Sequence, residues 1–474
     1  MDTEFELDGR LILVSNGEPY AHNYDENGKI NCEKLPGGLT TGLDPLMQKE
    51  KGVWIAWGRG EADFEVVDEK NRVKVPDEDG YTLKRIKLTP ADQDGFYYGF
   101  SNEVMWPICH SFIAKANYNK DYWYTYLDVN KQYAEAVLSG YKEGDLIWVH
   151  DYQLTLVPGF IKKQAPGAKV SMFWHIPWPS WEAFRTLPWR EELLNQMLKA
   201  DFLAFHIPLF VKNFLNCAEK IGAKVNRENK IVEYNGEETA VTSIPLGIDY
   251  SGFHRVAKSL DMDTRAREIK NYYNAEKLIF GVDRLDYTKG ILERLKAIDL
   301  LFEEYPRYLG KVTMVQRISP SRTQVEEYQE MREEINRTIA AINGKYQKDD
   351  WAPIKNFNRA VPQEELIPYY RAADIGLITP LIDGMNLVAK EYVAAQEDGV
   401  LILSEFAGAS SVLDEALTVN PYHIEKVADT LHRALQMSEE ERRRRMKYLK
   451  QKVHDYDINW WRDIFLKKWV ELYD

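Results

Sequence analysis

An alternation of two patterns along the whole chain limits the fold more than any other feature. Short apolar runs rich in β-branched and aromatic residues alternate with longer segments of helical periodicity. Continuous apolar runs are typical of parallel strands that helices cover on both faces. The sequence therefore predicts an α/β protein with strands at LILVSN 11–16, VWIAW 53–57, LIWVH 146–150, KVSMFWHI 169–176, DFLAFH 201–206, VTSIPLG 241–247, LIFGVD 278–283, KVTMVQRI 311–318, IKNFNR 354–359, DIGLIT 374–379 and VLILS 400–404.

The runs form two groups, separated by PLGIDYSGF at 245–253. A chain of 474 residues is too long for one hydrophobic core. We therefore expect two doubly wound, Rossmann-like domains facing each other across a cleft, one over residues 1–248 and one over 249–455. The amphipathic segment 456–474 is expected to be a helix that crosses back to the N-terminal domain, packing through Trp460, Ile464, Leu466 and Trp469.

Composition excludes several classes of protein. With 61 Lys and Arg against 74 Asp and Glu, the net charge of -13 argues against a broad basic face for nucleic acid or a membrane surface. Cys32, Cys109 and Cys217 are too few and too far apart for a disulfide framework or a zinc site. The acidic start MDTEFELDGR does not resemble a signal peptide, and no apolar run is long enough for a membrane span. We expect a cytoplasmic protein and leave a homo-oligomer open.

Two segments of the C-terminal half carry candidate phosphate-binding groups. In FGVDRLDYTKG at 280–290, Arg284 and Lys289 lie between a strand and a helix start, where a diphosphate can be held; ion pairs with Asp283 and Asp286 are the alternative.

The second segment is ITPLIDGMNLVAKEYVAAQ at 378–396, with a helix expected to begin near Met385. The loop amides at 385–387 could also bind a diphosphate. Asp383 lies in the loop, and Glu391 could accept hydrogen bonds from ribose hydroxyls or form a salt bridge with Lys390 or another basic group.

In the N-terminal half, two strands end in polar residues. His150, Asp151 and His175 could bind sugar hydroxyls, although a structural role for the histidines is the alternative. Trp174, Trp178 and Trp181 could pack on sugar faces. No histidine pair has metal-ligand spacing, so we expect no catalytic metal, and neither GxGxxG after the first strand nor GxSxG is present.

Taken in order, many motifs of the chain resemble the trehalose-6-phosphate synthase family of retaining glycosyltransferases, which includes the glucosylglycerol-phosphate synthases. The motifs are LPGGL at 35–39, FYYGFSNEVMWP at 96–107, WVHDY at 148–152, HIPWPSWEAFRTLPWRE at 175–191, DRLDYTKG at 283–290, SPSR at 319–322, INGKY at 342–346 and DGMNLVAKEYVAAQ at 383–396. The resemblance implies a GT-B fold and glucose transfer from a nucleotide-glucose, with UDP-glucose the first choice, to glucose 6-phosphate, without a cofactor. Glycerol 3-phosphate or another phosphorylated acceptor, or a non-catalytic sugar-phosphate-binding member, are the alternatives.

The resemblance also implies roles for individual residues. Donor binding falls on Gly38, Arg284, Lys289, Asn386, Leu387, Glu391, His175 and Asp383, of which Arg284, Lys289, Asp383 and His175 are the catalytic candidates. Acceptor binding falls on Tyr97, Trp106, Asp151 and Arg322.

The chain departs from the family pattern at two positions. Gly17 stands where the family usually has an arginine that reaches the acceptor phosphate, and Ile382 stands where it usually has another arginine. We expect Gly17 to leave an unfilled, uncharged space in the acceptor loop. The sequence therefore leaves both the acceptor and the donor nucleotide (UDP, GDP or ADP) open.

Overall fold

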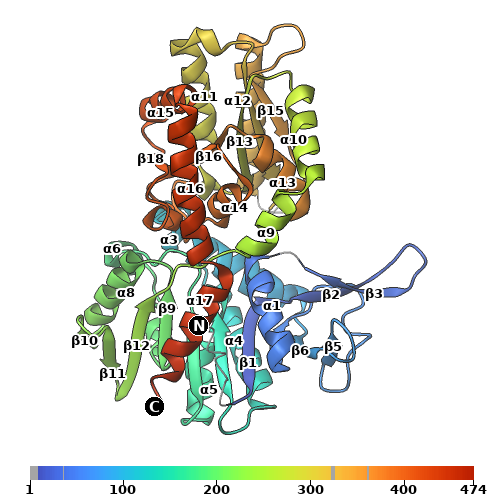
Figure 1. Cartoon of the computed structure of the whole chain (residues 1–474). Helices are drawn as coiled ribbons and strands as arrows, with labels where there is room; N and C mark the ends of the chain where they lie inside the picture. The colour runs from blue at the N-terminus through green and yellow to red at the C-terminus, as the bar shows by residue number, and fades with distance from the viewer. Residues whose placement is uncertain (1–8, 36, 322–325, 360–361, 474) are drawn as a thin grey trace. The chain divides into compact units, whose positions relative to one another are not determined.

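The computed structural model describes residues 9–35, 37–321, 326–359 and 362–473. The chain divides into two compact units, which we call the first unit (Met1–Ile244 and Trp461–Asp474) and the second unit (Pro245–Trp460). The sequence placed the corresponding boundaries after residues 248 and 455. Figure 1 shows the helices and strands of both units.

The first unit is built on a ten-stranded sheet of order β10-β11-β12-β9-β8-β7-β1-β4-β6-β5. Neighbouring strands from β12 to β6 are parallel, and antiparallel strands continue the sheet at both edges. Leu13 in the centre pairs with Trp54 on one side and Trp148 on the other. The strands are β1 Leu11–Gly17, β4 Val53–Trp57, β5 Arg72–Val75, β6 Tyr81–Ile86, β7 Leu146–His150, β8 Lys169–Phe173, β9 Phe202–Phe205, β10 Lys224–Asn226, β11 Ile231–Tyr234 and β12 Glu237–Ser243, with a separate hairpin of β2 Tyr20–Tyr24 and β3 Ile30–Lys34.

Helices connect these strands. They are α1 Gly38–Glu50, α2 Pro90–Asp92, α3 Trp106–Cys109, α4 Lys120–Leu138, α5 Val157–Gln164, α6 Trp181–Phe184, α7 Arg190–Met197 and α8 Pro208–Lys220, with short 3-10 turns at Ile113–Lys115 and Tyr152–Leu154. A π-helix, Gln93–Met105, joins α2 to α3. Helices of this type are rare and often occur at functional sites.

The last helix, α17 Ile458–Val470, completes the core of the first unit. Trp461 and Phe465 are fully buried, and the ring of Phe465 stacks on that of Trp148 at a centroid distance of 4.2 Å. Leu466 and Trp469 are buried as the sequence predicted. Trp460 and Ile464 are half-buried, because the fully buried face of the helix is centred on Trp461 and Phe465, one residue further along the chain.

The second unit contains a six-stranded parallel sheet of order β15-β14-β13-β16-β17-β18. Its strands are β13 Lys277–Arg284, β14 Val312–Ser319, β15 Ile354–Phe357, β16 Ile375–Ile378, β17 Val400–Ser404 and β18 Leu417–Val419. Its helices are α9 Tyr250–Ala257, α10 Leu260–Tyr272, α11 Ile291–Glu304, α12 Glu326–Tyr346, α13 Gln363–Ala372, α14 Leu387–Ala395, α15 Ile424–Gln436 and α16 Glu439–Asp455, with 3-10 turns at Tyr287–Lys289, Pro306–Tyr308 and Gly408–Ser411. Side chains of α11, α12 and α15 pack against one face of the sheet in a continuous apolar core.

All eleven apolar runs form strands, which confirms the predicted α/β class. In the parallel part of each sheet the order of the strands reverses once, between β1 and β7 in the first unit and between β13 and β16 in the second. Ligands of open α/β sheets bind beyond the carboxyl ends of the strands at such switch points. None of the helices in the described ranges is both long and apolar enough to cross a membrane.

Candidate active site

The switch point of the second unit gathers six residues singled out from the sequence. Arg284 is the last residue of β13, Lys289 ends the 3-10 turn that follows it, and the other members lie in the loop after β16 and on α14. We call this group the switch-point cluster; it consists of Arg284, Lys289, Asp383, Asn386, Leu387 and Glu391.

The turn after β13 is held in one conformation by its own residues. The carboxylate of Asp286 accepts hydrogen bonds from the backbone N–H and the hydroxyl of Thr288, at 3.0 and 2.9 Å. Gly290 follows with φ +63°, and a Cβ there would lie 2.4 Å from the carbonyl oxygen of Thr379. Only glycine fits this position, so the turn holds Lys289 close to the loop that follows β16.

Lys289 and Asp383 form an ion pair. The Lys289 Nζ lies 2.5 Å from Asp383 Oδ2, and the side-chain amide of Asn386 donates to the same oxygen at 3.0 Å. Both charged side chains are mostly buried, at 12% and 15% exposure. The alternative in which Lys289 pairs with Asp286 is therefore wrong, and the structure brings two predicted donor-binding residues into direct contact.

A buried arginine that the sequence analysis did not select supports this cluster. Arg294 on α11 donates to the carboxylate of Asp283 at 2.5 Å, and also to Gln316, Thr379 and the carbonyl oxygen of Lys289. The side chain connects β13, β14, the 287–289 turn and the end of β16. Asp283 therefore has an ion-pair partner that the sequence analysis did not name.

The helix that follows Asp383 starts at Leu387, two residues after the expected position. Asn386 has φ +71° and caps the helix, its side-chain oxygen accepting the N–H of Ala389 at 3.2 Å. The cap leaves the amides of residues 387 and 388 at the open end of the helix, where backbone N–H groups attract anions.

Glu391 lies one helical turn further along α14. Its side chain is buried and accepts a hydrogen bond from the hydroxyl of Tyr370 at 2.8 Å. Lys390 points elsewhere, because its Nζ donates to the carbonyl oxygen of Leu246 at 2.6 Å. The predicted alternative, a salt bridge between Glu391 and Lys390, is therefore wrong.

In the first unit, His150, Asp151 and His175 meet at the carboxyl ends of β7 and β8, and we call them the strand-end cluster. Asp151 has φ +73°, and its carboxylate accepts the backbone N–H of His175 at 3.1 Å. The Nδ1 of His150 and the Nε2 of His175 share a hydrogen bond of 3.1 Å.

Burial controls the protonation of this cluster. It lowers the pKa of both His150 and His175 well below the usual value, and each is lowered further by a neighbouring histidine. Two neutral imidazoles supply the one donor and one acceptor that the bond between them requires. Burial also raises the pKa of Asp151 to about 7.

Two of the tryptophans proposed as sugar-stacking surfaces belong to the core instead. Trp174 and Trp178 are buried at 0% and 1% exposure, and the indole N–H of Trp178 donates to Cys217 Sγ. Trp181 is half-buried. The prediction was wrong for these two residues because Trp178 packs against Phe214 of α8, and Trp174 packs against Trp178 and Tyr152.

The predicted acceptor-binding aromatics lie on the π-helix and on α3. The ring of Tyr97 is 5.9 Å from that of Trp57, which ends β4. Trp106 is buried, and its ring lies 4.0 Å from that of His110 and 6.0 Å from that of Tyr152. Tyr152 in turn follows the strand-end cluster directly.

A positive charge lies beside Gly17, which ends β1 at the switch point of the first unit. A Cβ at Gly17 would be 3.7 Å from Arg59 Nη2. The guanidinium of Arg59 lies over Trp57, 4.7 Å from the ring centroid, and 5.8 Å from the centroid of Tyr97. The expectation of an uncharged space at Gly17 is therefore wrong: an arginine from the loop after β4 occupies its surroundings.

Three further positions named from the sequence are Gly38, Ile382 and Arg322. Gly38 is the exposed first residue of α1, and Ile382 is half-buried in the loop before Asp383. Arg322 lies outside the described residues. Within the described part of the chain, no three His, Cys, Asp or Glu side chains are grouped as metal ligands, and independence from metals and cofactors stays a prediction.

Comparison with known proteins places this arrangement in a family. The sequence model of glycosyltransferase family 20 matches residues 9–471. The chain belongs to glycosyltransferase family 20. This family assignment confirms the resemblance found in the motifs and the expected class of enzyme.

Relatives within the family are similar over almost their whole length. A trehalose-6-phosphate synthase of Mycolicibacterium gilvum is 39% identical over 467 residues, covering 96% of this chain and 92% of that protein. A structure of the Escherichia coli protein bound to UDP-2-fluoro glucose is 33% identical with a TM-score of 0.87, covering 97% and 99% of the two chains. A synthase from Burkholderia xenovorans in complex with glucose-6-phosphate is 32% identical with a TM-score of 0.86, covering 97% and 100%. These structures confirm the predicted GT-B fold.

Proposed function

We propose that this chain transfers glucose, with retention of configuration, from UDP-glucose to glucose 6-phosphate and so makes trehalose 6-phosphate. The observation that carries the proposal is the switch-point cluster, in which a lysine, a carboxylate and an open helix N-terminus come together in a chain of family 20. Relatives of similar length are named for this reaction, and their structures are described with a UDP-glucose analogue or with glucose 6-phosphate.

In this proposal the diphosphate of the donor binds Arg284, Lys289 and the first amides of α14, with Gly38 beside it. Cations and open amides are the groups that recognise phosphate oxygens. Glu391 accepts hydrogen bonds from the ribose, since Tyr370 fixes its side chain through one carboxylate oxygen. Asp383 and His175 hold the glucose hydroxyls.

The chemical step needs no nucleophile from the protein. The bond between C1 of glucose and the phosphate oxygen breaks, and a bond from C1 to the acceptor hydroxyl oxygen forms on the same face. The proton of that hydroxyl moves to a leaving phosphate oxygen. Fixed positive charge at the leaving group stabilises the developing negative charge, and Lys289 and the α14 amides supply it.

For the acceptor, we assign Tyr97, Trp106 and Asp151 to the sugar and Arg59 to its phosphate, together with Arg322. Arg59 is the arginine that the structure places beside Gly17, where the family usually has its own. This charge supports a phosphorylated acceptor; glucose 6-phosphate is the first choice because a similar structure is described in complex with it, and glycerol 3-phosphate is the competing acceptor. We also propose that the enzyme acts in the cytoplasm, where the three free cysteines stay reduced.

The test is the release of UDP from UDP-glucose with each acceptor in turn. Arg284→Ala and Lys289→Ala should each lower turnover by a factor of about 100 or more, as for other electrostatic groups at a leaving oxygen. Lys296→Ala removes an exposed lysine of α11 and serves as the matched control. Near-normal turnover in both cluster variants would refute the donor assignment, and faster turnover with glycerol 3-phosphate than with glucose 6-phosphate would refute the acceptor.

A further inference from the structure

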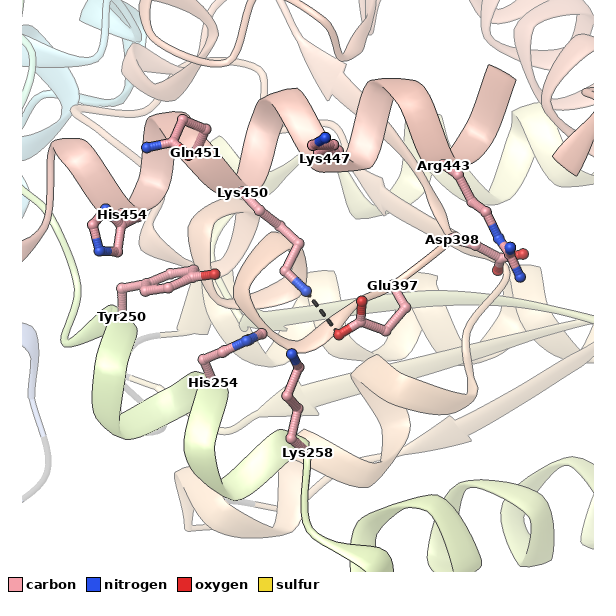
Figure 2. A pocket seen from close by; sticks show the side chains of 10 residues that line it. All are labelled: Tyr250, His254, Lys258, Glu397, Asp398, Arg443, Lys447, Lys450, Gln451 and His454. Atoms are coloured by element: carbon pink, nitrogen blue, oxygen red, sulfur yellow. Dashed lines mark hydrogen bonds and ion pairs between the residues drawn. The ribbon is translucent and has the colours of Figure 1, made fainter. Parts of the chain in front are cut away.

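A pocket separate from the switch-point cluster lies in the second unit between α9, α16 and the segment that follows α14. Figure 2 shows side chains from these three elements around the pocket. Its volume is about 690 Å³, a size common among small-molecule sites. It shares no residue with the switch-point cluster. The lining consists of Tyr250, His254, Lys258, Glu397, Asp398, Arg443, Lys447, Lys450, Gln451 and His454.

The carboxylates of this pocket are already paired. Arg442, which lies outside the lining, binds the carboxylate of Asp398 at 2.9 Å, and Glu397 pairs with Lys450 at 2.9 Å. Among the described residues, no carboxylate lies within 4.0 Å of the amino groups of Lys258 and Lys447. The pocket therefore offers two lysines that form no ion pair among the described residues; the charge of Lys258 acts on Glu397, which Lys450 already pairs.

One wall of the pocket combines aromatic rings with neutral hydrogen-bonding groups. The ring of Tyr250 stacks on that of His254 at 5.1 Å, and the ring of His454 meets it edge-on at 5.3 Å. His254 donates through Nδ1 to the carbonyl oxygen of Ala394, which leaves Nε2 as its second polar atom. Together with the amide of Gln451, these groups can meet the hydroxyls of a ligand.

We propose that this pocket binds a small hydroxylated phosphate monoester, with the phosphate held by Lys258 and Lys447, and that its binding alters the affinity for the nucleotide donor. A phosphate monoester carries close to two negative charges at neutral pH, which matches the two unpaired lysines. Lysine binds phosphate as a point charge and needs no fixed geometry. The Tyr250 wall and the Glu397 carboxylate suit the hydroxylated part of such a molecule.

Helix α14 connects the pocket to the proposed donor site, and the proposed effect on donor affinity rests on the proposed function. His254 donates to the carbonyl of Ala394 at 3.1 Å and Lys450 to that of Gln396 at 2.7 Å, so both bind the C-terminal end of α14. The N-terminal end of the same helix carries Asn386, Leu387 and, one turn in, Glu391. A ligand that draws Lys450 or His254 toward itself changes contacts at one end of a nine-residue helix whose other end belongs to the switch-point cluster.

Lysine acetylation of the full-length protein, read by mass spectrometry, tests the site without reference to activity. Ribose 5-phosphate and inorganic phosphate serve as probes, and sodium chloride of equal ionic strength serves as the control. We expect either probe to slow the acetylation of Lys258 and Lys447 by about fivefold or more, with Lys296 and Lys452 unchanged. Equal rates at all four lysines with and without probe would overturn the site.

The link to the donor is tested by calorimetric titration of UDP with and without ribose 5-phosphate. The double variant Lys258→Gln/Lys447→Gln removes the proposed phosphate contacts, and Lys296→Gln/Lys452→Gln removes the same charge from exposed or half-buried positions elsewhere in the second unit. We expect ribose 5-phosphate to change the UDP Kd about fivefold or more in the wild type and the control pair, and not in the pocket pair. The same change in all three proteins would overturn the link, whereas failure of the proposed function would show as an absence of UDP binding while the acetylation result stands.

Discussion

Arg59→Ala is the change that tests the acceptor site most directly. The Arg59 guanidinium is stacked on Trp57, and among the described residues no carboxylate forms an ion pair with it. Its charge is therefore available to a bound phosphate. Loss of one charge-assisted hydrogen bond costs about 1.5 to 3 kcal/mol, so the KM for glucose 6-phosphate should rise roughly ten- to a hundredfold.

The neighbouring Gly17 allows a sharper form of this experiment. Because a Cβ at Gly17 would lie 3.7 Å from Arg59 Nη2, Gly17→Arg in the wild type places a second arginine side chain beside Arg59, and the two guanidinium groups approach each other when both reach for one phosphate. Their repulsion at about 4 Å costs between about 1 and 4 kcal/mol, depending on exposure to solvent, and cancels the gain of a second phosphate contact. In the Arg59→Ala background the same substitution meets no repulsion and should restore much of the lost affinity.

The assay is the acceptor KM of four proteins: wild type, each single variant and the double variant. Both glucose 6-phosphate and glycerol 3-phosphate are titrated at saturating UDP-glucose. Donor KM should change little, since neither residue belongs to the switch-point cluster. An Arg59→Ala enzyme with unchanged KM for both acceptors would refute the assignment of the phosphate to this loop.

Two predictions concern stability. Burial lowers the pKa of Lys390 from 10.5 to about 7. Between these pH values the folded state gives up a proton that the unfolded state keeps. The burial of Lys390 therefore lowers the free energy of unfolding by its full amount below pH 7, and by less and less as the pH rises toward 10.5. Lys390→Met removes this penalty. The free energy of unfolding of the variant, relative to that of the wild type, should therefore be about 2 to 3 kcal/mol higher at pH 6 than at pH 9. Thermal unfolding of both proteins at each pH measures this difference, and a difference independent of pH would contradict the prediction. Gly290→Ala should lower the unfolding temperature much more than Gly310→Ala. Both glycines have positive φ, but only at Gly290 would the added Cβ meet the backbone, at the carbonyl oxygen of Thr379. Equal decreases would show that this contact does not exclude a Cβ at position 290.

Much of the fold could be predicted because its signals are local. An apolar run such as LIWVH shows a buried strand without knowledge of its neighbours, and all eleven runs form strands. The sequence did not predict edge strands such as β3 (INCEK) and β5 (RVKV), because half or more of their residues are polar and their side chains are largely exposed to solvent. In α17 the adjacent Trp460 and Trp461 left the buried face ambiguous by one residue.

The candidate site divides in the same way. Arg284, Lys289 and Asp383 could be selected because each follows a predicted strand. Arg59 also follows a predicted strand and could have been considered, whereas Arg294 could not, because nothing in its local sequence distinguishes it from an exposed arginine. Its partner Thr379 is 85 residues away in the chain, and only the folded sheet brings such groups together.

The return of α17 to the first unit affects how the protein is made. On the ribosome, residues 1–244 emerge first, yet the space beside Trp148 and Phe173 stays open until Trp461 and Phe465 are synthesised. At typical elongation rates this delay lasts roughly ten to forty seconds, during which a broad apolar surface of the nascent chain is exposed. A stop codon that removes Trp461 and Phe465 would therefore damage the part of the protein that is translated first.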